Sequence, residues 1–400
     1  MRLRYKAATK EGKLSQGLLD AKDIQEAATY LRAKGLMPIQ IVRIDNQILT
    51  QIPFLNKVKT SDLILFTRQM SSMLSAGLTL MKSLEILKDQ MTNVTMQEII
   101  TSIINDVSEG KTFSQAIAKH PKLFSNIYIS IIKAGEASGL LDKVLARLAD
   151  NLEKQAKLKS TIRGALMYPI IVIILMLVVM SIMMIFVIPQ LTVLYENLNV
   201  PLPLPTQILI GISNFVSIFW PVILALAFVG GYFFKRWSKT LSGRLILDDV
   251  ILKIPVFGKL IRQTILAEFS RTFGLLVGTG TLVVEALNET AETAGNVHYK
   301  NAIVAIGTQV EKGVTVGTAM SSSTLFPSLL IQLTKIGEQT GKMDETLQKA
   351  SEYFEREVDQ MVKTLTTAME PFIMIVLGIG VSFLIISVIT PIYSLMSRIQ

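Results

Sequence analysis

An apolar run extends from Ile170 to Ile188 and contains no charged residue. As an α-helix it would measure about 28 Å, which is close to the thickness of the hydrocarbon layer of a membrane. Two further runs of this kind occupy residues 208–234 and 372–389, and Pro221 near the middle of the former predicts a kink. The hydrophobic pattern therefore predicts three transmembrane helices.

Basic residues are concentrated on one side of these runs, and Arg398 after the third run is the exception. Residues 147–163, before the first run, contain five Lys or Arg, and residues 235–244, after the second, contain four, whereas the Pro-rich segment between the runs has none. Because cytoplasmic loops carry the Lys and Arg excess, we expect the N-terminus and both polar regions in the cytoplasm and the C-terminus outside. These flanks account for much of the net charge of +9, so the charge gives no reason to expect a nucleic-acid partner.

The chain contains an internal repeat with an offset of about 203 residues, which becomes 202 after a one-residue deletion near Pro121. Each copy is a polar region followed by an apolar run that is entered at a proline, Pro169 in the first copy and Pro371 in the second. Two copies that enter the membrane from the same side need an extra span to bring the chain back, and the second run supplies it. The matched pairs include Phe66 and Phe269, Arg68 and Arg271, Gly77 and Gly280, Gly110 and Gly313, Gly135 and Gly337, Glu136 and Glu338, and Gly139 and Gly341.

Apolar residues in the polar part of each copy recur every three or four positions, which is the spacing of amphipathic helices. Glycine, asparagine and proline breakers predict about six helices per copy, with the first helix ending at Gly77 in one copy and at Gly280 in the other. The last helix of the first copy meets no breaker between Leu140 and Gly164. We therefore expect it to continue from the bundle into the membrane and to join the two mechanically.

Residues 1–44 have a different pattern, in which residues 2–9, 14–19 and 37–44 have the composition of strands and residues 23–34 that of a helix. The predicted fold is thus mainly α: an integral membrane protein with three transmembrane helices, two repeated cytoplasmic six-helix bundles and a small N-terminal αβ module. The predicted parts are the αβ module with the start of a linker (1–50), the first bundle (60–168), the first span (169–189), an external loop (190–206), the second span (207–234), the second bundle (262–370) and the third span (371–393).

Several kinds of chemistry are absent from the sequence. There is no cysteine, and His120 and His298 have no partner at metal-ligand spacing, so we predict no disulfide, no metal site and no cofactor. Residues 109–112 resemble the end of a phosphate-binding loop, but Asn105 stands where that loop needs a glycine. No catalytic set of residues can be assembled, so we expect no enzyme. Whether a metal binds at a subunit interface stays open.

Motifs in both copies resemble the platform-protein family of type II secretion systems and type IV pili, over essentially the whole chain. They are FTRQ (66–69), AGL (76–78), KAGEASG (133–139) and LMYP (166–169) in the first copy, FSRT (269–272), IGEQTG (336–341), EVD (357–359) and EP (370–371) in the second, and LPLPT (202–206) between them. This resemblance implies a protein of the bacterial cytoplasmic (inner) membrane that couples a cytoplasmic assembly ATPase to insertion of pilins or pseudopilins into a fibre. It also implies contacts with other inner-membrane assembly proteins and self-association as a homo-oligomer. The overall similarity of the sequence to the family favours a pilus machine over a secretion machine.

Glu136 and Glu338 are candidates for contacts with partner proteins, because each lies in a matching glycine-bounded segment where its carboxylate could meet basic groups on a partner. The alternative is structural: the glycines permit a tight turn between helices, and each glutamate belongs to that turn. The glycines concerned are Gly135 and Gly139 in the first copy and Gly337 and Gly341 in the second.

Arg68 and Arg271 are also partner-contact candidates, but they fall on apolar helix faces. For them we favour a salt bridge within the domain or a helix cap.

Two further classes of function compete with a scaffold. One is a small transporter or channel subunit, and the other is a membrane signalling receptor. The predicted spans contain no ionisable residue, which disfavours ion-coupled transport, and the predicted external loop is short for a receptor. We therefore favour the scaffold.

Overall fold

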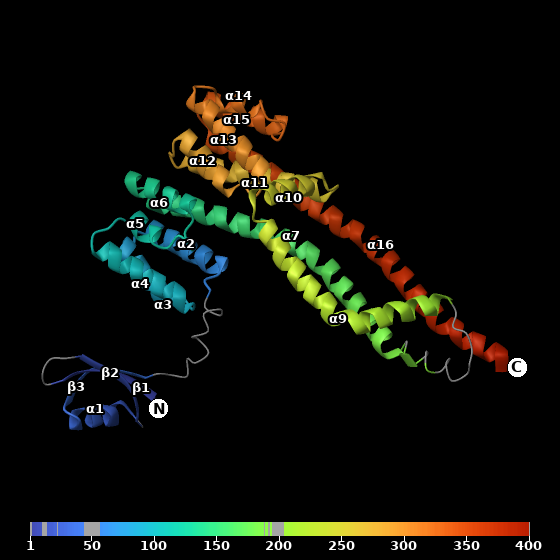
Figure 1. Ribbon diagram of the computed structural model, residues 1–400. Helices are drawn as coiled ribbons and strands as arrows, with labels where there is room; N and C mark the ends of the chain where they lie inside the picture. Colours follow the sequence, from blue (N-terminus) through green and yellow to red (C-terminus); the bar gives the residue numbers. More distant parts are fainter. Residues whose placement is uncertain are drawn as a thin grey trace.

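The computed structural model describes residues 2–9, 14–21, 23–43, 57–187, 189–190, 193 and 204–399. The predicted external loop at residues 190–206 and the linker after the N-terminal module lie largely outside these residues. The described part of the chain is mainly helical (Figure 1).

The N-terminal residues form a three-stranded antiparallel sheet in the order β2-β1-β3, with one helix packed against β1 and β3. The helix begins after Asp23, whose Oδ1 accepts a hydrogen bond from the Glu26 N–H at 2.7 Å and so caps the first turn. The elements are β1 (Arg2–Thr9), β2 (Leu14–Asp20), α1 (Ile24–Ala33) and β3 (Leu36–Arg43).

The first bundle consists of six helices, as predicted. Its core contains an aromatic chain in which the rings of Phe66 and Phe124 lie 6.1 Å apart and those of Phe124 and Tyr128 lie 5.0 Å apart. The Tyr128 hydroxyl is 3.1 Å from Thr67 Oγ1, so its polar end is satisfied although the ring is buried. The helices are α2 (Thr60–Ser75), α3 (Leu80–Gln90), α4 (Val94–Ser108), α5 (Phe113–Ala118), α6 (Asn126–Ser138) and α7 (Leu141–Ile182).

The second bundle repeats this arrangement with six helices, and its first helix begins at Phe257, ahead of the predicted start at 262. Phe269 and Phe326, which match Phe66 and Phe124, again lie in contact, with ring centroids 5.4 Å apart. The helices are α11 (Phe257–Gly278), α12 (Val283–Thr293), α13 (Val297–Glu311), α14 (Val316–Met320), α15 (Ser328–Thr340) and α16 (Met343–Ile399).

The repeat extends to the backbone at the helix ends. Gly77 and Gly280 follow α2 and α11 with φ of 86° and 87°, and Gly139 and Gly341 follow α6 and α15 with φ of 69° in both. A side chain would be strained in this left-handed region, which is why glycine stands at all four positions. The prediction that α2 and α11 end at Gly77 and Gly280 is confirmed.

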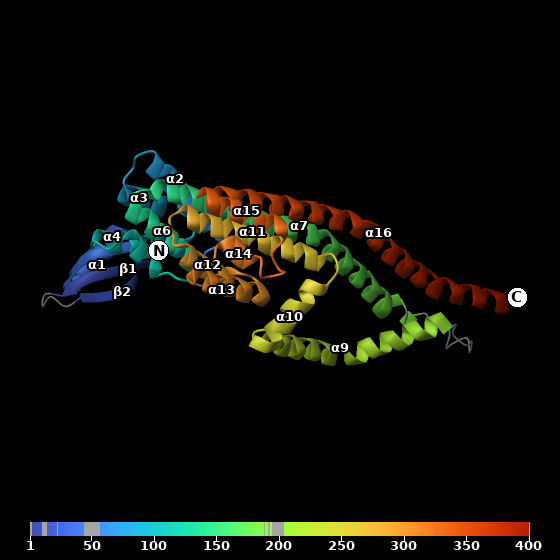
Figure 2. The same cartoon turned by 90° about the horizontal axis from the view of Figure 1, so that it is seen from above.

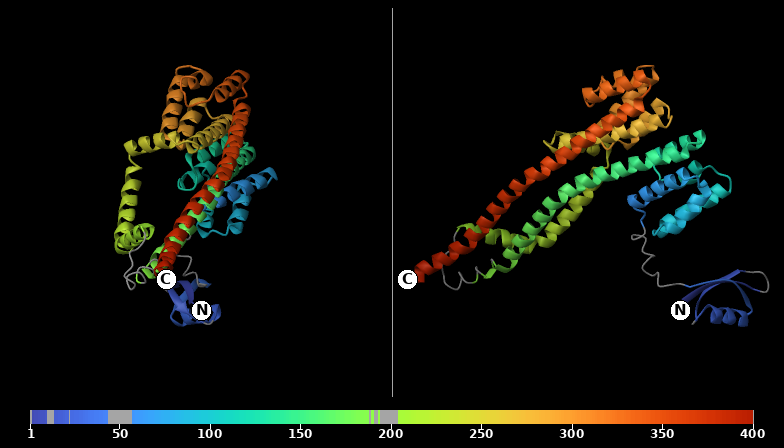
Figure 3. Two further views of the ribbon diagram at one scale, coloured as in Figure 1. Left: turned by 90° about the vertical axis from the view of Figure 1, so that its right-hand side faces the viewer. Right: turned by 180° about the vertical axis from the view of Figure 1, so that it is seen from behind.

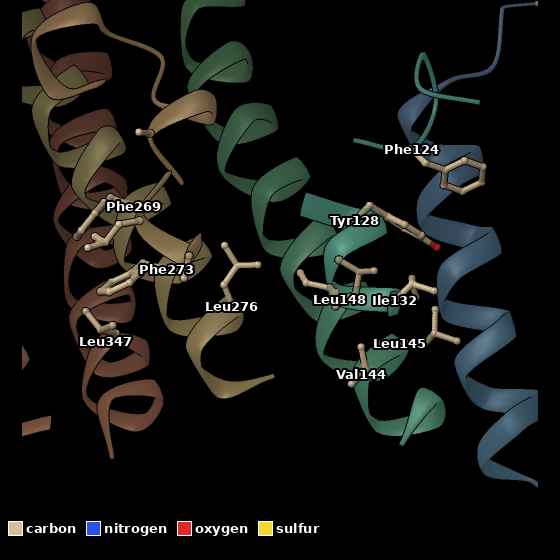
Figure 4. Packing of buried hydrophobic residues seen from close by; sticks show 14 of the residues in the cluster. Phe124, Tyr128, Ile132, Val144, Leu145, Leu148, Phe269, Phe273, Leu276 and Leu347 are labelled. Atoms are coloured by element: carbon tan, nitrogen blue, oxygen red, sulfur yellow. The ribbon is translucent and has the colours of Figure 1, made fainter. Parts of the chain in front are cut away.

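The two bundles share one hydrophobic core across the face where α7 meets α11 and α16. In Figure 4, Leu276 of α11 lies between that helix and α7, whereas Phe269 and Phe273 lie on the side of α11 that faces α16, and Leu145 lies on the side of α7 that faces α2. The bundles are therefore packed together as one body and are not separated by a linker.

Two long helices carry the bundles towards the membrane. The 42-residue α7 continues through Pro169, and the 57-residue α16 continues through Pro371, with no break at either proline (Figure 3). The prediction of a continuous helix after Leu140 is confirmed. Both helices are long and apolar enough to cross a membrane. Within α7, the only polar group of the apolar run is Ser181, whose hydroxyl donates to the Leu177 carbonyl at 2.8 Å.

The helix α9 (Leu204–Trp237) contains the second predicted apolar run and Pro221, and it bends along its length (Figure 2). A short π-helical segment, Met183–Val187, follows α7 before the chain reaches α9. After α9 the chain turns sharply into α10 (Leu241–Lys253), which packs on α11 and α13. The repeat pattern did not predict α10, because this helix has no counterpart in the first copy.

Candidate functional site

The Glu136 carboxylate is fixed inside the first bundle at the beginning of the short helix α5. Its Oε1 accepts from the Phe113 N–H at 2.7 Å, and its Oε2 accepts from the Ser114 N–H at 3.1 Å and from the Ser114 hydroxyl at 2.7 Å. The first amides of a helix have no partner within the helix, so this carboxylate satisfies two of them. Glu136 therefore acts as a remote cap that holds α5 on α6.

Glu338 repeats this arrangement in the second bundle. It accepts from the Val316 N–H at 2.9 Å and the Gly317 N–H at 3.2 Å, at the start of α14. Gly317 stands where the first copy has Ser114, so the hydroxyl contact has no counterpart. The structural alternative for both glutamates thus agrees with the geometry, and contact with a partner protein stays a prediction.

The prediction that two glycines bound each interhelical turn is wrong for the first glycine of each pair. Gly135 and Gly337 lie within the last turns of α6 and α15, and only Gly139 and Gly341 form the helix ends. Gly135 is required for a different reason: a Cβ there would lie 2.9 Å from the Val144 Cβ of α7. Added atoms at Gly337 would collide with the hydroxyl of Thr346 in the same way. These two glycines let each long helix pack closely on the helix before it.

Arg68 clamps the first long helix. It joins α2 to α7 by a bidentate pair with Glu153, both distances being 2.8 Å, and by a contact of 2.5 Å with Asp150. The hydrogen bonds that Arg68 donates to Glu153 lower the pKa of that carboxyl group. Together with the one that Arg68 donates to Asp150, they raise the pKa of the guanidinium. The Arg68 side chain is 35% exposed, so this clamp lies at the surface.

Arg271 makes the matching clamp between α11 and α16. Its Nη2 lies 2.7 Å from Oε1 of Glu355, which matches Glu153. The Arg271 side chain is only 4% exposed, because α7 of the first bundle lies over it. As predicted for both arginines, each forms a salt bridge within its own domain.

The contact between the two bundles, which we call the junction, is closed by ion pairs that the sequence did not predict. Arg147 on α7 donates to the Gly278 carbonyl at 2.9 Å and lies 3.7 Å from Asp344 on α16. Lys154, two turns along α7, lies 3.5 Å from Glu352. Nearer the membrane the junction becomes apolar, where Leu158, Leu260, Val358 and Val362 are buried together.

Below this apolar contact, α7 and α16 enclose an open groove of about 550 Å³ at the level where the helices approach the membrane. Small and hydroxylated residues line most of it. Lys157 and Lys363 face it from the two helices. The groove lies between the two long helices, just before their apolar segments begin.

The first bundle also contains a buried carboxylate that has no counterpart in the second. Asp106, with a side chain 8% exposed, pairs with Lys111 at 2.6 Å and Lys119 at 2.5 Å, and these lysines lower the pKa of its carboxyl group. The repeat places Gln309 and Ser322 where the first copy has Asp106 and Lys119, and these form a neutral hydrogen bond of 3.3 Å. The first bundle alone therefore carries an acid-sensitive contact at this position.

The described residues hold no group of three or more His, Asp and Glu side chains that could bind a metal ion. His120 is partly buried, and burial lowers its pKa.

These features define a membrane-anchored helical scaffold: two copies of one bundle, locked together by ion pairs, each continuous with a membrane-length helix. The chain belongs to the family of type II secretion system (T2SS) protein F, which residues 66–189 and 269–391 match as two copies of one domain. Residues 4–42 match the N-terminal domain of type II secretion system protein F. The relatedness found in the sequence motifs is thereby confirmed.

The chain is similar along almost its full length to proteins of two kinds of machine. It is 36% identical to type IV pilus assembly protein PilC of Thermus thermophilus, over 99% of this chain and 98% of that protein. It is 34% identical to PilC of Myxococcus xanthus, over 99% and 95%, respectively. To type II secretion system protein F of Xanthomonas campestris it is 30% identical, over 99% of both chains.

Proposed function

We propose that this chain is the inner-membrane platform of a type IV pilus machine, where it couples a cytoplasmic assembly ATPase to the addition of pilin subunits. The pilus assignment is supported by the identities of 34–36% to three full-length PilC proteins, against 26–30% to type II secretion proteins F. Pseudopilins of a secretion machine would be the corresponding substrate in the less similar relatives.

In this proposal the chain crosses the membrane three times, at residues 169–189, 207–234 and 371–393. The N-terminal module and both bundles lie in the cytoplasm, where they meet the ATPase, and the C-terminus lies outside. Other inner-membrane assembly proteins, further copies of this chain and the lipid bilayer are its membrane partners. ATP hydrolysis belongs to the partner, so the chain itself acts as a structural component and not as an enzyme.

The observation that carries the proposal is the unbroken continuity of α7 and α16 from the bundles into their apolar segments. A helix is stiff over this length, so a rotation or tilt of either bundle is transmitted to the membrane-side segment. A flexible joint in α7 should therefore separate the bundle's movement from the span while leaving both folded.

Insertion of Gly-Gly-Ser after Gly164 places such a joint between the junction and the span. We expect normal membrane abundance but loss of surface fibres, counted by electron microscopy in cells whose own copy of the gene is deleted. The matched control is the same insertion after Thr92, which lies in the exposed turn between α3 and α4. Normal fibre numbers with the Gly164 insertion at wild-type abundance would contradict the coupling role.

A further inference from the structure

The junction brings together two different faces of the repeated bundle. The first copy contributes the outer face of α7, which carries Arg147, Asn151 and Lys154. The second copy contributes a face formed by α11 and α16, which carries Asp344 and Glu352. Because the two faces are not the same part of the bundle, the contact is of the head-to-tail kind, in which each unit has one face of each type.

Each bundle therefore retains the face that its partner bundle uses. The first bundle has an unused acidic face, in which Asp142 and Asp150 match Asp344 and Glu352. The second has an unused basic face, in which Lys349 and Arg356 match Arg147 and Lys154. The sign of the charge is the same at all four matched positions.

Both unused faces are open. Lys349 and Arg356 are exposed, and the Asp150 side chain, which also lines the cavity at the junction, is 61% exposed. Two large apolar residues are also exposed there: Tyr353, at 39%, matches Asn151 of the basic face, and Leu65, at 47%, matches Glu268, which lines the junction opposite Asn151. An aromatic ring and a leucine thus stand uncovered at two positions that would face each other.

We infer that copies of this chain associate head-to-tail through a second contact of the junction type, with α16 of one copy against α2 and α7 of the next. Lys349 would pair with Asp142 of the next copy, Arg356 with its Asp150, and Tyr353 would cover its Leu65. The contact between copies is thus predicted from the contact within one copy.

The difference between the two arginine clamps supports this inference. In the closed junction, Glu352 pairs with Lys154 across the interface, and the buried Arg271 pairs with Glu355 of its own bundle. In the open first bundle Asp150, the match of Glu352, instead turns back to Arg68, which is half-buried. This is the arrangement expected of the same face before a partner covers it.

The direction of the long helices is compatible with a membrane-bound assembly. Both α7 and α16 run from their bundles in the same general direction (Figures 1 and 3). The contact that joins the two bundles of one chain therefore keeps both on the same side of a membrane. A second contact of this type would place the bundles of the next copy on that side as well.

The contact between copies should be weaker than the junction. The apolar contact near the membrane has no counterpart in it, because Gln360 and Ser160 match Leu158 and Val362. Ser75 also stands where the junction has Gly278, whose missing Cβ leaves room for Arg147. A reversible association is expected, which suits an assembly that forms and dissolves in the membrane.

Disulfide cross-linking tests this inference in the full-length chain, which has no cysteine of its own. A variant with both Leu65→Cys and Tyr353→Cys should, on oxidation in native membranes, give a ladder of covalent dimers and higher species. Either substitution alone should give no ladder. The pair Asn151→Cys and Glu268→Cys, at the matching positions of the junction, should close within one chain and calibrate the reaction. Tyr353→Cys with Leu282→Cys, a residue 74% exposed on a different part of the bundle, is the control for random collision.

A charge exchange gives an independent readout. With the cysteine pair in place, Arg356→Asp should reduce the dimer yield at least fivefold, and Asp150→Arg in the same chain should restore it. The inference is overturned if the Leu65 and Tyr353 pair stays monomeric while the junction pair closes, or if the control pair gives an equal ladder. It is also overturned if Tyr353→Cys alone gives dimers, because that result indicates a symmetric contact. The inference deepens the proposed self-association and is independent of the pilus assignment, which is tested by fibre counts and not by cross-linking.

Discussion

Removal of the Glu136 carboxylate tests its role as a remote cap of α5. Glu136→Ala would leave the N–H groups of Phe113 and Ser114 and the Ser114 hydroxyl without their acceptor, and all three lie in a partly buried setting. A lost hydrogen bond to a charged group costs more than a neutral one, but water can reach part of this site, so we take about 1 kcal/mol for each contact. The expected loss in stability of the docked α5 is therefore about 3 kcal/mol.

Glu338→Ala provides a built-in comparison. Glu338 accepts from two amides and no hydroxyl, so the expected loss is about 2 kcal/mol. The two substitutions should thus differ by the contribution of one hydroxyl contact, in otherwise matching surroundings.

Thiol labelling of a buried cysteine measures this loss in the intact membrane protein. Ala116 in α5 and Ala319 in α14 occupy matching positions and are fully buried, so a cysteine at either position reacts only when its short helix undocks. Each 1.4 kcal/mol raises the population of the open state tenfold. Labelling at Ala116→Cys should therefore accelerate about 100-fold in the Glu136→Ala background, and labelling at Ala319→Cys about 30-fold in the Glu338→Ala background.

The opposite hypothesis makes a different forecast. If the glutamates act mainly through contacts with a partner, labelling should rise less than threefold while fibre formation is lost at normal protein abundance. That result would refute the cap as their principal role. If either substitution accelerated thiol labelling in both bundles, the cap interpretation would also be contradicted, because each cap lies in its own bundle.

Two further predictions follow from the charged contacts. Arg271→Ala should destabilise the second bundle by about 3 kcal/mol, because it removes the buried cationic partner of Glu355 and leaves that carboxylate with the Ser351 hydroxyl as a donor. Arg68→Ala at the surface should cost about 1 kcal/mol. The same labelling assay measures both losses, and equal costs would contradict the burial argument. Lys111 and Lys119 hold the pKa of Asp106 below its ordinary value, so the stability that this carboxylate contributes is present above about pH 4 and is lost as the pH falls through the lower folded-state pKa. Asp106→Asn should therefore flatten the acid dependence of hydrogen exchange in α4, after correction for intrinsic rates, and identical profiles for the two proteins would count against this reasoning.

The parts of the fold that depend on local pattern could be predicted from the sequence. The six helices of each bundle, the ends of α2 and α11 and the continuity of α7 follow from helical spacing and from the positions of breakers. The turn predicted over residues 135–139 is wrong at its start, because Gly135 lies within α6, where the absence of a side chain allows close packing against Val144. Sequence spacing does not distinguish a glycine that ends a helix from one that admits a neighbour.

The contacts that define the candidate site depend on residues far apart in sequence. Glu136 binds backbone amides 22 and 23 residues away, and a backbone amide leaves no signature in the residue type. The arginine clamps could have been found from the repeat, because Arg68 and Glu153 recur as Arg271 and Glu355, at offsets of 203 and 202 on the two sides of the deletion near Pro121. The junction itself joins unmatched positions, so no comparison of the two copies could have identified its ion pairs.

The duplication explains why one chain can contain both an exposed and a buried form of the same clamp. Tandem copies with identical faces can satisfy only one head-to-tail contact within a chain, and one face of each type is left open. In this protein the acidic face around Arg68 stays open, and its match around Arg271 is covered by α7. Residues of the covered face must preserve the packing of the two bundles. Residues of the open face must either stay compatible with solvent or bind a partner. The charges at Asp142, Asp150, Lys349 and Arg356 are those that a contact between copies would require, while Ser160 and Gln360 nearer the membrane are polar and give that contact no apolar part.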